Sequence, residues 1–142
     1  MNKVHFSMES NEWTTPKYLY DELDKEFNFT LDPCCTKESA KCDKYYTKED
    51  DGLSKDWSND IVFMNPPYGR IIPKWIEKAY KESLKGAVVV CLIPARTDTR
   101  YWHNYIFPHA KVRFIKGRVK FGGNQKGSSA APFPSAIVIF RK

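Results

Sequence analysis

Two continuous apolar runs stand out along the chain, at residues 61–64 and 87–93. Uninterrupted apolar runs of this length are typical of strands that are buried on both faces of a sheet. Both runs are followed closely by proline, at Pro66 and at Pro94. Since proline has no N–H to donate to a strand ladder, we expect both strands to end there.

A helix with one buried face is predicted before the first run. Leu19, Leu23 and Phe27 recur at intervals of four residues, which places them on one side of a helix. Thr15 is expected to cap the N-terminus of this helix, with Pro16 at the first helical position.

A second helix is predicted between the two apolar runs. It is expected to begin at Pro73 and to end at about Lys85, because Gly86 follows and glycine is frequent after a last helical turn. Apolar residues at helical spacing should face the sheet, namely Trp75, Ile76, Ala79 and Leu84.

The remaining elements show weaker patterns. We expect short strands at 29–31, 45–47, 111–115, 118–121 and 136–140, one or two helical turns within 36–44, and loops at 48–59 and 122–134. A short helix should run to Phe107, capped by Asp98 or Thr99, and Trp102 within it is assigned to the core.

Helices and strands in this order predict an α/β fold. Residues 1–142 are expected to form a single domain with a sizeable core, in which residues 1–12 are a loose arm. We expect a compact, mostly parallel sheet with an antiparallel pair of strands at the C-terminal end. Because ligands bind beyond the carboxyl ends of strands in open α/β sheets, residues 32–35 and 65–68 are where chemistry is expected.

Charge is divided unevenly along the chain. The net charge is +6, yet residues 1–60 carry 8 Lys and 14 Asp or Glu, whereas residues 61–142 carry 15 Lys or Arg and 3 Asp or Glu. A basic half suits a polyanion, above all nucleic acid, and the alternative is that it serves solubility. No apolar run reaches the length of a membrane span, and the first ten residues lack the apolar region of a signal peptide.

Four cysteines stand at Cys34, Cys35, Cys42 and Cys91. Without a secretory signal they are expected to be reduced thiols. Their spacing lacks the paired Cys-x-x-Cys units of zinc sites, so no metal is predicted and the cysteines are interpreted as small apolar side chains.

The segment Asn65-Pro66-Pro67-Tyr68 gives the clearest indication of chemistry. Its prolines fix the backbone so that the Pro66 carbonyl points out of the ladder, beside the side-chain carbonyl of Asn65. These two acceptors match the two hydrogens of a planar amino group, and Tyr68 offers a flat face for stacking. Acceptors held in place favour attack by an amine whose lone pair is otherwise delocalised. We therefore interpret all four residues as catalytic, acting on the exocyclic amine of a base or on a side-chain amide.

This tetrad resembles the catalytic tetrad of S-adenosylmethionine-dependent amino-methyltransferases. Further blocks surround it in order: Glu12-Trp13-Thr14-Thr15-Pro16, Leu31-Asp32-Pro33-Cys34-Cys35, Asp51-Gly52-Leu53 with Asp56-Trp57, Pro94-Ala95-Arg96-Thr97-Asp98-Thr99 and Ala131-Pro132-Phe133-Pro134-Ser135. Together they resemble the small phage-type, Dam-like DNA N6-adenine methyltransferases over nearly the whole chain. The resemblance implies a Rossmann-like methyltransferase fold and methyl transfer from S-adenosylmethionine to N6 of adenine.

The resemblance also implies where the cofactor binds. A helix N-terminus near Thr15 suits the methionyl carboxylate, and Asp32 can accept from the methionyl ammonium group. The residues assigned to S-adenosylmethionine are Trp13, Thr14, Thr15, Pro16, Asp32, Pro33, Cys34, Asp50, Asp51 and Asn65. The loop after Asp32 departs from the family pattern, because it has no glycine.

Some of these assignments have alternatives. Thr15 can be an ordinary helix cap, and Trp13 can pack on Leu19 instead of covering the cofactor. Asp50 and Asp51 are candidates for contacts with the ribose or the adenine of the cofactor, and Asp50 can equally be a solvated charge.

Double-stranded DNA is the partner that the resemblance implies, with the target adenine flipped out of the duplex. The candidate DNA contacts are Arg96, Asp98, Arg100, Arg118, Lys120 and Lys126. For each cation the alternative is ordinary surface charge, and Asp98 either caps a helix or orients an arginine. Because 142 residues leave no room for a separate target-recognition domain, we expect a short or relaxed recognition sequence.

Other functions fit the same residues. The tetrad can hold adenine in RNA or a protein glutamine amide, and a methyltransferase fold without turnover can serve as a nucleic-acid-binding module. The chain is expected to act as a monomer or homodimer, in the cytoplasm of a bacterial host if it is encoded by a phage or prophage.

Overall fold

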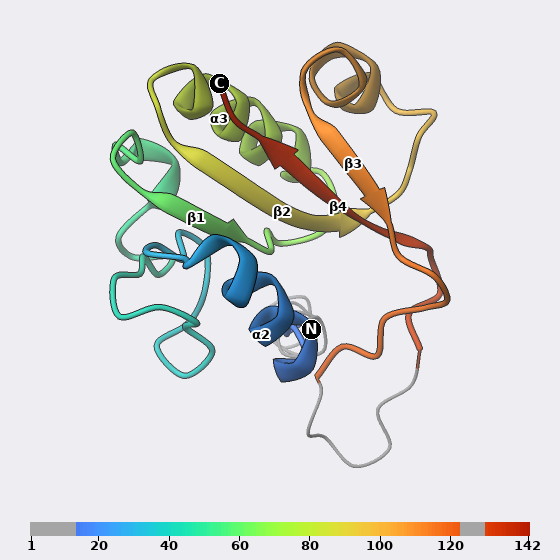
Figure 1. Ribbon diagram of the computed structural model, residues 1–142, viewed down its shortest axis with the longest axis horizontal. Coiled ribbons are helices and arrows are strands. Elements are labelled where there is room, and N and C mark those ends of the chain that lie inside the picture. The colour runs from blue at the N-terminus through green and yellow to red at the C-terminus, as the bar shows by residue number, and fades with distance from the viewer. Residues whose placement is uncertain (1–13, 123–129) are drawn as a thin grey trace.

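A computed structural model of the chain describes residues 14–122 and 130–142. Its sheet has four strands, in the order β1 (Ile61–Met64), β2 (Val88–Pro94), β4 (Ser135–Phe140) and β3 (Lys111–Phe114) (Figure 1). β1 pairs with β2 in parallel, whereas β4 is antiparallel to both β2 and β3. The α/β class and the antiparallel C-terminal pair are thus confirmed. The sheet is mixed rather than mostly parallel, because β4 lies between β2 and β3 and runs against both.

Helices cover both faces of this sheet (Figure 1). α2 (Lys17–Phe27) packs on one face, and α3 (Ile72–Leu84) lies on the other together with η2 (Trp102–Ile106) and α4 (Phe107–His109). The side chains of successive β1 residues pack on opposite faces of the sheet: Val62 and Met64 pack on the α3 side, and Phe63 packs on the α2 side. The apolar runs are therefore continuous because both faces of the central strands are buried.

α2 has the predicted buried stripe but not the predicted cap. Leu19, Leu23 and Phe27 are buried, as expected. Pro16 occupies the N-cap position in an extended conformation (φ −63°, ψ 143°), which leaves Thr15 outside the helix. Thr15 therefore makes no cap, and its hydroxyl serves a different partner, described below.

α3 begins one residue before the predicted Pro73, which lies in its first turn. Trp75, Ile76 and Ala79 are buried as predicted, but the prediction for Leu84 was wrong, since half of its surface is exposed. The buried positions of the last turn belong to Glu82 and Ser83 instead. The Glu82 carboxylate accepts a hydrogen bond from the backbone of Trp57 at 2.6 Å, which gives this buried charge a partner.

Three weaker predictions were wrong. Residues 29–32 pair with β1 through a single parallel bridge between Leu31 and Val62, rather than as a regular strand. Residues 118–121 form no strand; Val119 accepts one backbone hydrogen bond, from Ala131. Residues 36–44 contain turns but no helix. Each of these segments is short, so its local preference is weak and tertiary contacts decide its shape.

The predicted helix ending near Phe107 is present, with a different geometry. Its middle forms a π-helical turn in which the Phe107 N–H donates to the carbonyl of Trp102, five residues earlier. Thr99 does not cap it, because the Thr99 hydroxyl donates to the Arg96 carbonyl at 2.8 Å. The exposed Asp98 gives this turn no side-chain cap either. Trp102 is fully buried, which confirms its assignment to the core.

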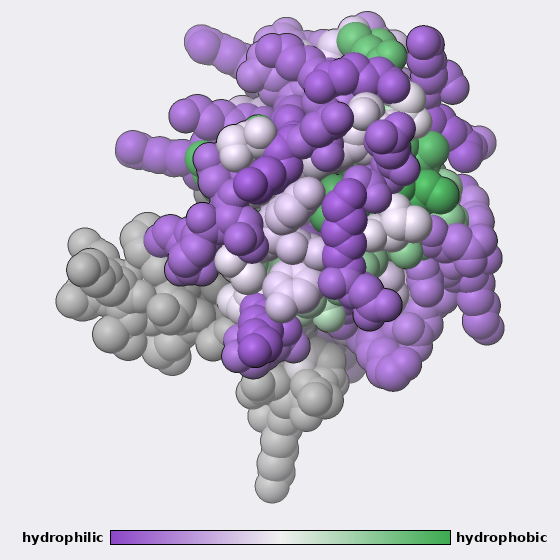
Figure 2. Space-filling model, turned by 90° about the vertical axis from the view of Figure 1, so that its left-hand side faces the viewer, coloured by the Kyte–Doolittle hydropathy of each residue, from purple (hydrophilic) through white to green (hydrophobic). Residues whose placement is uncertain are grey.

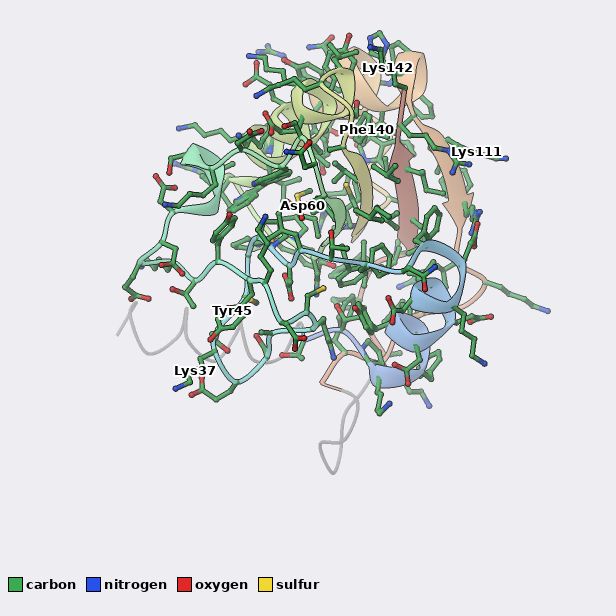
Figure 3. The ribbon with its side chains drawn as sticks, turned by 60° about the vertical axis from the view of Figure 1, so that its left-hand side comes forward. Lys37, Tyr45, Asp60, Lys111, Phe140 and Lys142 are labelled. Atoms are coloured by element: carbon green, nitrogen blue, oxygen red, sulfur yellow. The ribbon has the colours of Figure 1, made fainter. Side chains whose placement is uncertain are left out.

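The segment between Leu31 and β1 is fastened to the sheet by polar contacts. Asp60, at the start of β1, accepts from the Thr30 hydroxyl at 3.0 Å and from the Lys44 ammonium group at 2.8 Å. Figure 3 shows Asp60 beside the sheet and Tyr45 farther out on the coil segment. Tyr45 forms an isolated bridge with Asp32, so this coil lies against the carboxyl end of the 30–32 segment.

A close backbone contact holds the same region from the other side. The Trp57 indole donates to the Gly52 carbonyl at 3.0 Å, and the Trp57 ring stacks on Trp75 of α3. This places Gly52 against the carbonyl of Pro33, so closely that a Cβ at position 52 would overlap that oxygen. Only glycine fits at this approach, which fixes the position of Pro33.

The face shown in Figure 2 is mainly hydrophilic, with hydrophobic residues in small separate areas. Within the two described segments, no helix is both long enough and apolar enough to cross a bilayer.

Gly52→Ala should lower the free energy of unfolding by about 3 kcal/mol, because the overlap with the Pro33 carbonyl involves backbone that cannot rotate away. Gly117→Ala is the matched control: Gly117 has a positive φ (75°) but open space around it, so a loss of about 1 kcal/mol is expected. Urea unfolding of both variants measures the difference. A loss for Gly52→Ala no greater than that for the control would contradict the close contact.

Candidate active site

The candidate catalytic and cofactor residues meet at the carboxyl ends of the parallel strands. Asn65 follows the last residue of β1, and Asp32 follows the bridge that pairs Leu31 with this strand. Pro94 ends the neighbouring β2. The structure thus brings together the two segments that the sequence assigned to chemistry, 32–35 and 65–68.

Asn65 is held by a residue that lies 50 positions earlier. Its side-chain nitrogen donates to the Thr15 hydroxyl oxygen at 2.9 Å. Thr15 is buried, with 4% of its surface exposed, so water competes little for this contact. The segment before α2 therefore contacts the candidate catalytic tetrad directly.

Pro66 ends the β1–β2 ladder. The N–H of Phe63 donates to the Leu31 carbonyl, on the side of β1 away from β2. Successive residues of a strand direct their N–H and C=O groups to opposite sides, so those of Met64 are directed toward β2. The next N–H on that side would belong to position 66, and its acceptor would be the carbonyl of Leu92. Proline has no N–H, and the hydroxyl of Tyr68 donates to Leu92 instead, at 3.3 Å.

Tyr68 is also enclosed by aromatic rings. Phe121 and Phe133 meet its ring edge-on, with centroids 5.9 and 5.6 Å away, and the guanidinium of Arg96 lies over the Phe133 ring at 5.6 Å. Burial raises the pKa of Tyr68 well above its usual value. The phenol therefore stays neutral and can serve as a stacking surface, not as a base.

A pocket of about 360 Å³ opens beside Tyr68. Its remaining lining comes from the start of α3, the end of β2 and the turn that follows: Gly69, Arg70, Ile72, Pro73, Pro94, Arg96, Thr99 and Tyr101. Sequence analysis missed Arg70 and Tyr101 as candidates. The sequence position of Arg70 could have identified it, because it lies two residues after the tetrad. Nothing in the sequence around Tyr101 indicates a site, and it lines the pocket only because of the path of the chain after β2.

Asp32 lies on the side of Asn65 that includes the 33–42 loop. Its carboxylate accepts from the backbone N–H of Lys41 at 3.0 Å, and 4% of the residue is exposed. Burial raises the pKa of Asp32 to about 6, against the lowering effect of backbone hydrogen bonds from Lys41 and Cys34. Among the described residues no basic side chain forms an ion pair with it. The positive charge of Lys41 lowers the pKa of Asp32 only in part, so the site contains a buried carboxylate that is not neutralised by an ion pair in this part of the chain.

The cysteines beside Asp32 are protonated thiols. Burial raises the pKa of Cys34 and of Cys35, and the nearby Asp32 carboxylate raises both further. All four cysteines are free, and within residues 14–122 and 130–142 no cluster of His, Cys, Asp or Glu is arranged to hold a metal ion. Cys34 and Cys35 therefore act as small, weakly polar walls of the loop.

The other assigned cofactor residues differ in their placement. Asp50 is exposed and closes a turn, where it accepts from the backbone and the hydroxyl of Thr47 at 2.9 and 3.1 Å. Asp51 is exposed too, with a left-handed backbone (φ 58°). Thr14 is half-buried before Thr15. Trp13 lies outside the described residues.

Comparison with known proteins decides which reaction this arrangement performs. A family model described as DNA N-6-adenine-methyltransferase (Dam) matches residues 5–142. The chain belongs to this family. It is therefore an enzyme that methylates N6 of adenine in DNA, which confirms the family resemblance of its ordered sequence blocks.

Phage and bacterial proteins are among the relatives of this Dam-family chain. The DNA N-6-adenine-methyltransferase of Haemophilus phage HP1 (strain HP1c1) is 28% identical over 134 residues, which cover 90% of the chain and 77% of the relative. That of Escherichia phage T1 is 29% identical over 93 residues, 63% of the chain and only 38% of the relative. The putative methyltransferase YfdM of Escherichia coli (strain K12) is 37% identical over 65 residues, 41% of the chain and 71% of the relative.

Four of the six candidate DNA contacts of the methyltransferase form two pairs. Arg96 lines the pocket, and the exposed Arg100 follows it by four residues. Arg118 donates to the Ala131 carbonyl at 3.4 Å, and Lys120 is exposed beside it. Asp98 is exposed in the turn before the π-helical segment. The last candidate, Lys126, lies outside the described residues.

The pH dependence of stability should report the burial of Asp32. The pKa of Asp32 in the folded chain, about 6, lies above the usual 3.8. As the pH falls, Asp32 is therefore protonated at a higher pH in the folded state than in the unfolded state. This group therefore adds stability as the pH falls from about 6 to 4, and that stability is lost again as the pH rises through 6. Asp32→Asn removes the effect.

The unfolding free energy of Asp32→Asn relative to the wild type should accordingly be higher at pH 7 than at pH 4, by up to about 3 kcal/mol. Urea titrations of both proteins at the two pH values measure this. Parallel pH profiles for the two proteins would show that Asp32 titrates normally.

Proposed function

We propose that the chain transfers a methyl group from S-adenosylmethionine to N6 of an adenine flipped out of double-stranded DNA, on a Rossmann-like methyltransferase fold. One observation carries this proposal: the carboxamide of Asn65 is anchored to Thr15 at the carboxyl end of β1, the same edge of the sheet that carries the buried Asp32 and the pocket lined by Tyr68. A methyl donor and a planar amine acceptor need such adjoining compartments.

The residues on the Asp32 side fit the cofactor. A buried carboxylate that forms no ion pair among the described residues is complementary to the methionyl ammonium group. Thr14, Thr15 and Pro16 precede α2 and would hold the cofactor together with Asp32, Pro33 and Cys34, and Trp13, Asp50 and Asp51 complete the proposed set. When bound, S-adenosylmethionine supplies a methyl group made electrophilic by the sulfonium.

Asn65 and Pro66 act on the acceptor amine. The Asn65 side-chain carbonyl and the Pro66 backbone carbonyl would accept its two hydrogens, which pulls the amine out of conjugation with the ring and makes the nitrogen lone pair available. Both acceptors are held before the substrate arrives, so little reorganisation is needed in the transition state. The methylated amine then carries an acidic proton, which these two oxygens hold until water removes it.

Tyr68 and its pocket suit the flipped base. The hydroxyl bond to Leu92 and the edge-on contacts of Phe121 and Phe133 keep the Tyr68 ring in one place. Stacking on a fixed ring offsets part of the few kcal/mol that flipping requires. Pro67 is exposed between Pro66 and Tyr68, and its ring restricts the backbone of the segment that leads to Tyr68.

Cations gather where the duplex would lie. Arg70 and Arg96 line the pocket itself. We propose that they contact the phosphates next to the flipped adenine, and that Arg100, Arg118, Lys120 and Lys126 contact phosphates farther along. Asp98 lies among them and is proposed to orient one of these arginines.

Asn65→Ala should lower kcat by about 10² to 10³, the usual effect of removing one preorganised polar group from a transition state. The assay follows tritium from labelled S-adenosylmethionine into N6-methyladenine of unmethylated duplex DNA, and sequencing of the product maps the target site. Asn104→Ala, which changes an exposed asparagine of η2, is the matched control and should retain activity. Label that appears in RNA or protein but not in DNA, or activity that survives Asn65→Ala, would sink the proposal.

Asp32→Asn should weaken S-adenosylmethionine binding about tenfold to hundredfold at pH 7.5, since a charge-assisted hydrogen bond contributes roughly 1.5–3 kcal/mol. Wild-type affinity should also fall as the pH drops below about 6, where Asp32 becomes protonated, and this dependence should vanish in the variant. Isothermal titration calorimetry measures both effects, with the exposed Asp43→Asn as control. Unchanged affinity in Asp32→Asn would remove Asp32 from the cofactor site.

A further inference from the structure

Two exposed phenylalanines contact the same buried tryptophan outside the candidate active site. Trp102 has no exposed surface, whereas Phe107 and Phe114 are 48% and 62% exposed. The centroid of the Phe107 ring lies 5.2 Å from that of Trp102, and the Phe114 ring lies 6.3 Å away at an interplanar angle of 7°. Only four large hydrophobic side chains are exposed in the described part of the chain, so half of them gather on one buried ring.

Phe114 lies at the edge of the sheet that carries the pocket. β3 runs in the same direction as β1 and β2, because β4 between them is antiparallel to both of its neighbours. The carboxyl ends of these three strands therefore meet at one edge (Figure 1). Phe114 is the last residue of β3 and pairs with Ala136, and the adjoining Ser135 pairs with Pro94 of the pocket.

The Phe114 ring and the pocket also lie on the same face of the sheet. Trp102 packs on the α3 side, and Tyr101 directly before it lines the pocket. Neighbouring strands lie about 4.8 Å apart, so β3, two strands from β2, is about 10 Å away from it. This distance corresponds to about three base steps of a duplex, at about 3.4 Å each. A DNA molecule with one base in the pocket thus extends past Phe114.

The charge around these rings favours nucleic acid. Residues 99–142 contain nine Lys or Arg and no Asp or Glu, and Arg100 and Lys116 are exposed within two residues of the stacked rings. Among the described cations of this segment, Arg113 alone forms an ion pair, with Glu26 of α2. A second copy of this face would bring like charges together, whereas DNA offers phosphates to the cations and flat bases to the rings.

An aromatic side chain can stack on a duplex only where a base is uncovered. In a continuous stack each base is covered by its neighbours on both sides, and a flipped nucleotide leaves a gap whose bordering bases have lost one neighbour. We propose that Phe114, supported from behind by Trp102, stacks on a base that borders the gap left by the flipped adenine. Phe114 is then a positioning residue that stabilises the flipped state without touching the reacting atoms.

This inference rests on the proposed function, because the gap forms only when adenine leaves a duplex. The test measures dissociation constants for three duplexes by fluorescence anisotropy, with S-adenosylhomocysteine present to prevent turnover. The first duplex carries the sequence methylated in the assay above. The second has an abasic site in place of the target adenine, so that the gap exists without a base in the pocket. The third lacks the target sequence.

Phe114→Leu keeps an apolar side chain but removes the aromatic face. It should weaken binding of the first two duplexes about tenfold, the size expected for one stacked base, and leave binding of the third unchanged. Because no phosphate contact is lost, the slope of log Kd against log salt concentration should stay at its wild-type value. Phe114→Trp keeps an aromatic face and should bind all three duplexes as the wild-type protein does.

Two further variants separate stacking from packing and from charge. Phe107→Leu removes the other exposed ring on Trp102, but Phe107 begins α4 and so precedes the start of β3, whereas Phe114 ends that strand. It should leave all three dissociation constants unchanged. Arg100→Ala removes a cation instead of a ring, and should weaken binding of all three duplexes and reduce the salt slope by about one.

Several results would overturn the inference. Phe114→Leu could leave the first two duplexes bound as tightly as before, it could weaken all three equally, or Phe107→Leu could match its effect. A loss of DNA binding that accompanies conversion of a dimer to a monomer in sedimentation would instead make this face an interface between two copies of the chain. Failure of the proposed function has a different signature, since the wild-type protein would then place no methyl group on duplex DNA and would bind the first and third duplexes equally.

Discussion

The absence of one N–H group, at Pro66, shapes the whole candidate site. It ends the β1–β2 ladder at the carboxyl edge of the sheet, so that the carbonyl of Leu92 is left for another donor. Tyr68 takes that place through its hydroxyl. A single backbone constraint therefore ends the strand, turns Asn65 and Pro66 out of the sheet and fixes the aromatic ring beside them.

The division of charge along the chain corresponds to a division in space. The residues proposed for the cofactor come from the acidic first part of the chain, and those that line the pocket come from 68–101, in the basic part. Asn65 stands between the two groups, bonded to Thr15 on one side and followed by Tyr68 on the other. In the proposed function, the polyanion and the cationic cofactor would each meet residues of suitable charge.

Rigid neighbours support each group that is proposed to act. Trp57 and Gly52 fasten Pro33, backbone amides hold the carboxylate of Asp32, and Phe133 packs on Tyr68. The Phe133 ring lies in turn beneath the Arg96 guanidinium. Such support matters because acceptors for an amine help only if they are in place before the transition state forms.

The sequence by itself determined the two central strands and both main helices, since continuous apolar runs, helical spacing and paired prolines act locally, and it supplied the hypothesis about the chemistry of the tetrad. It did not determine the cap of α2, the burial of Leu84 or the shape of 118–121, where tertiary contacts outweigh weak local preference. The bond from Asn65 to Thr15, the raised pKa of Asp32 and the place of Arg70 in the pocket were decided only by the tertiary structure. Each depends on groups that are distant in the chain, or on a burial that only the packed sheet and helices create.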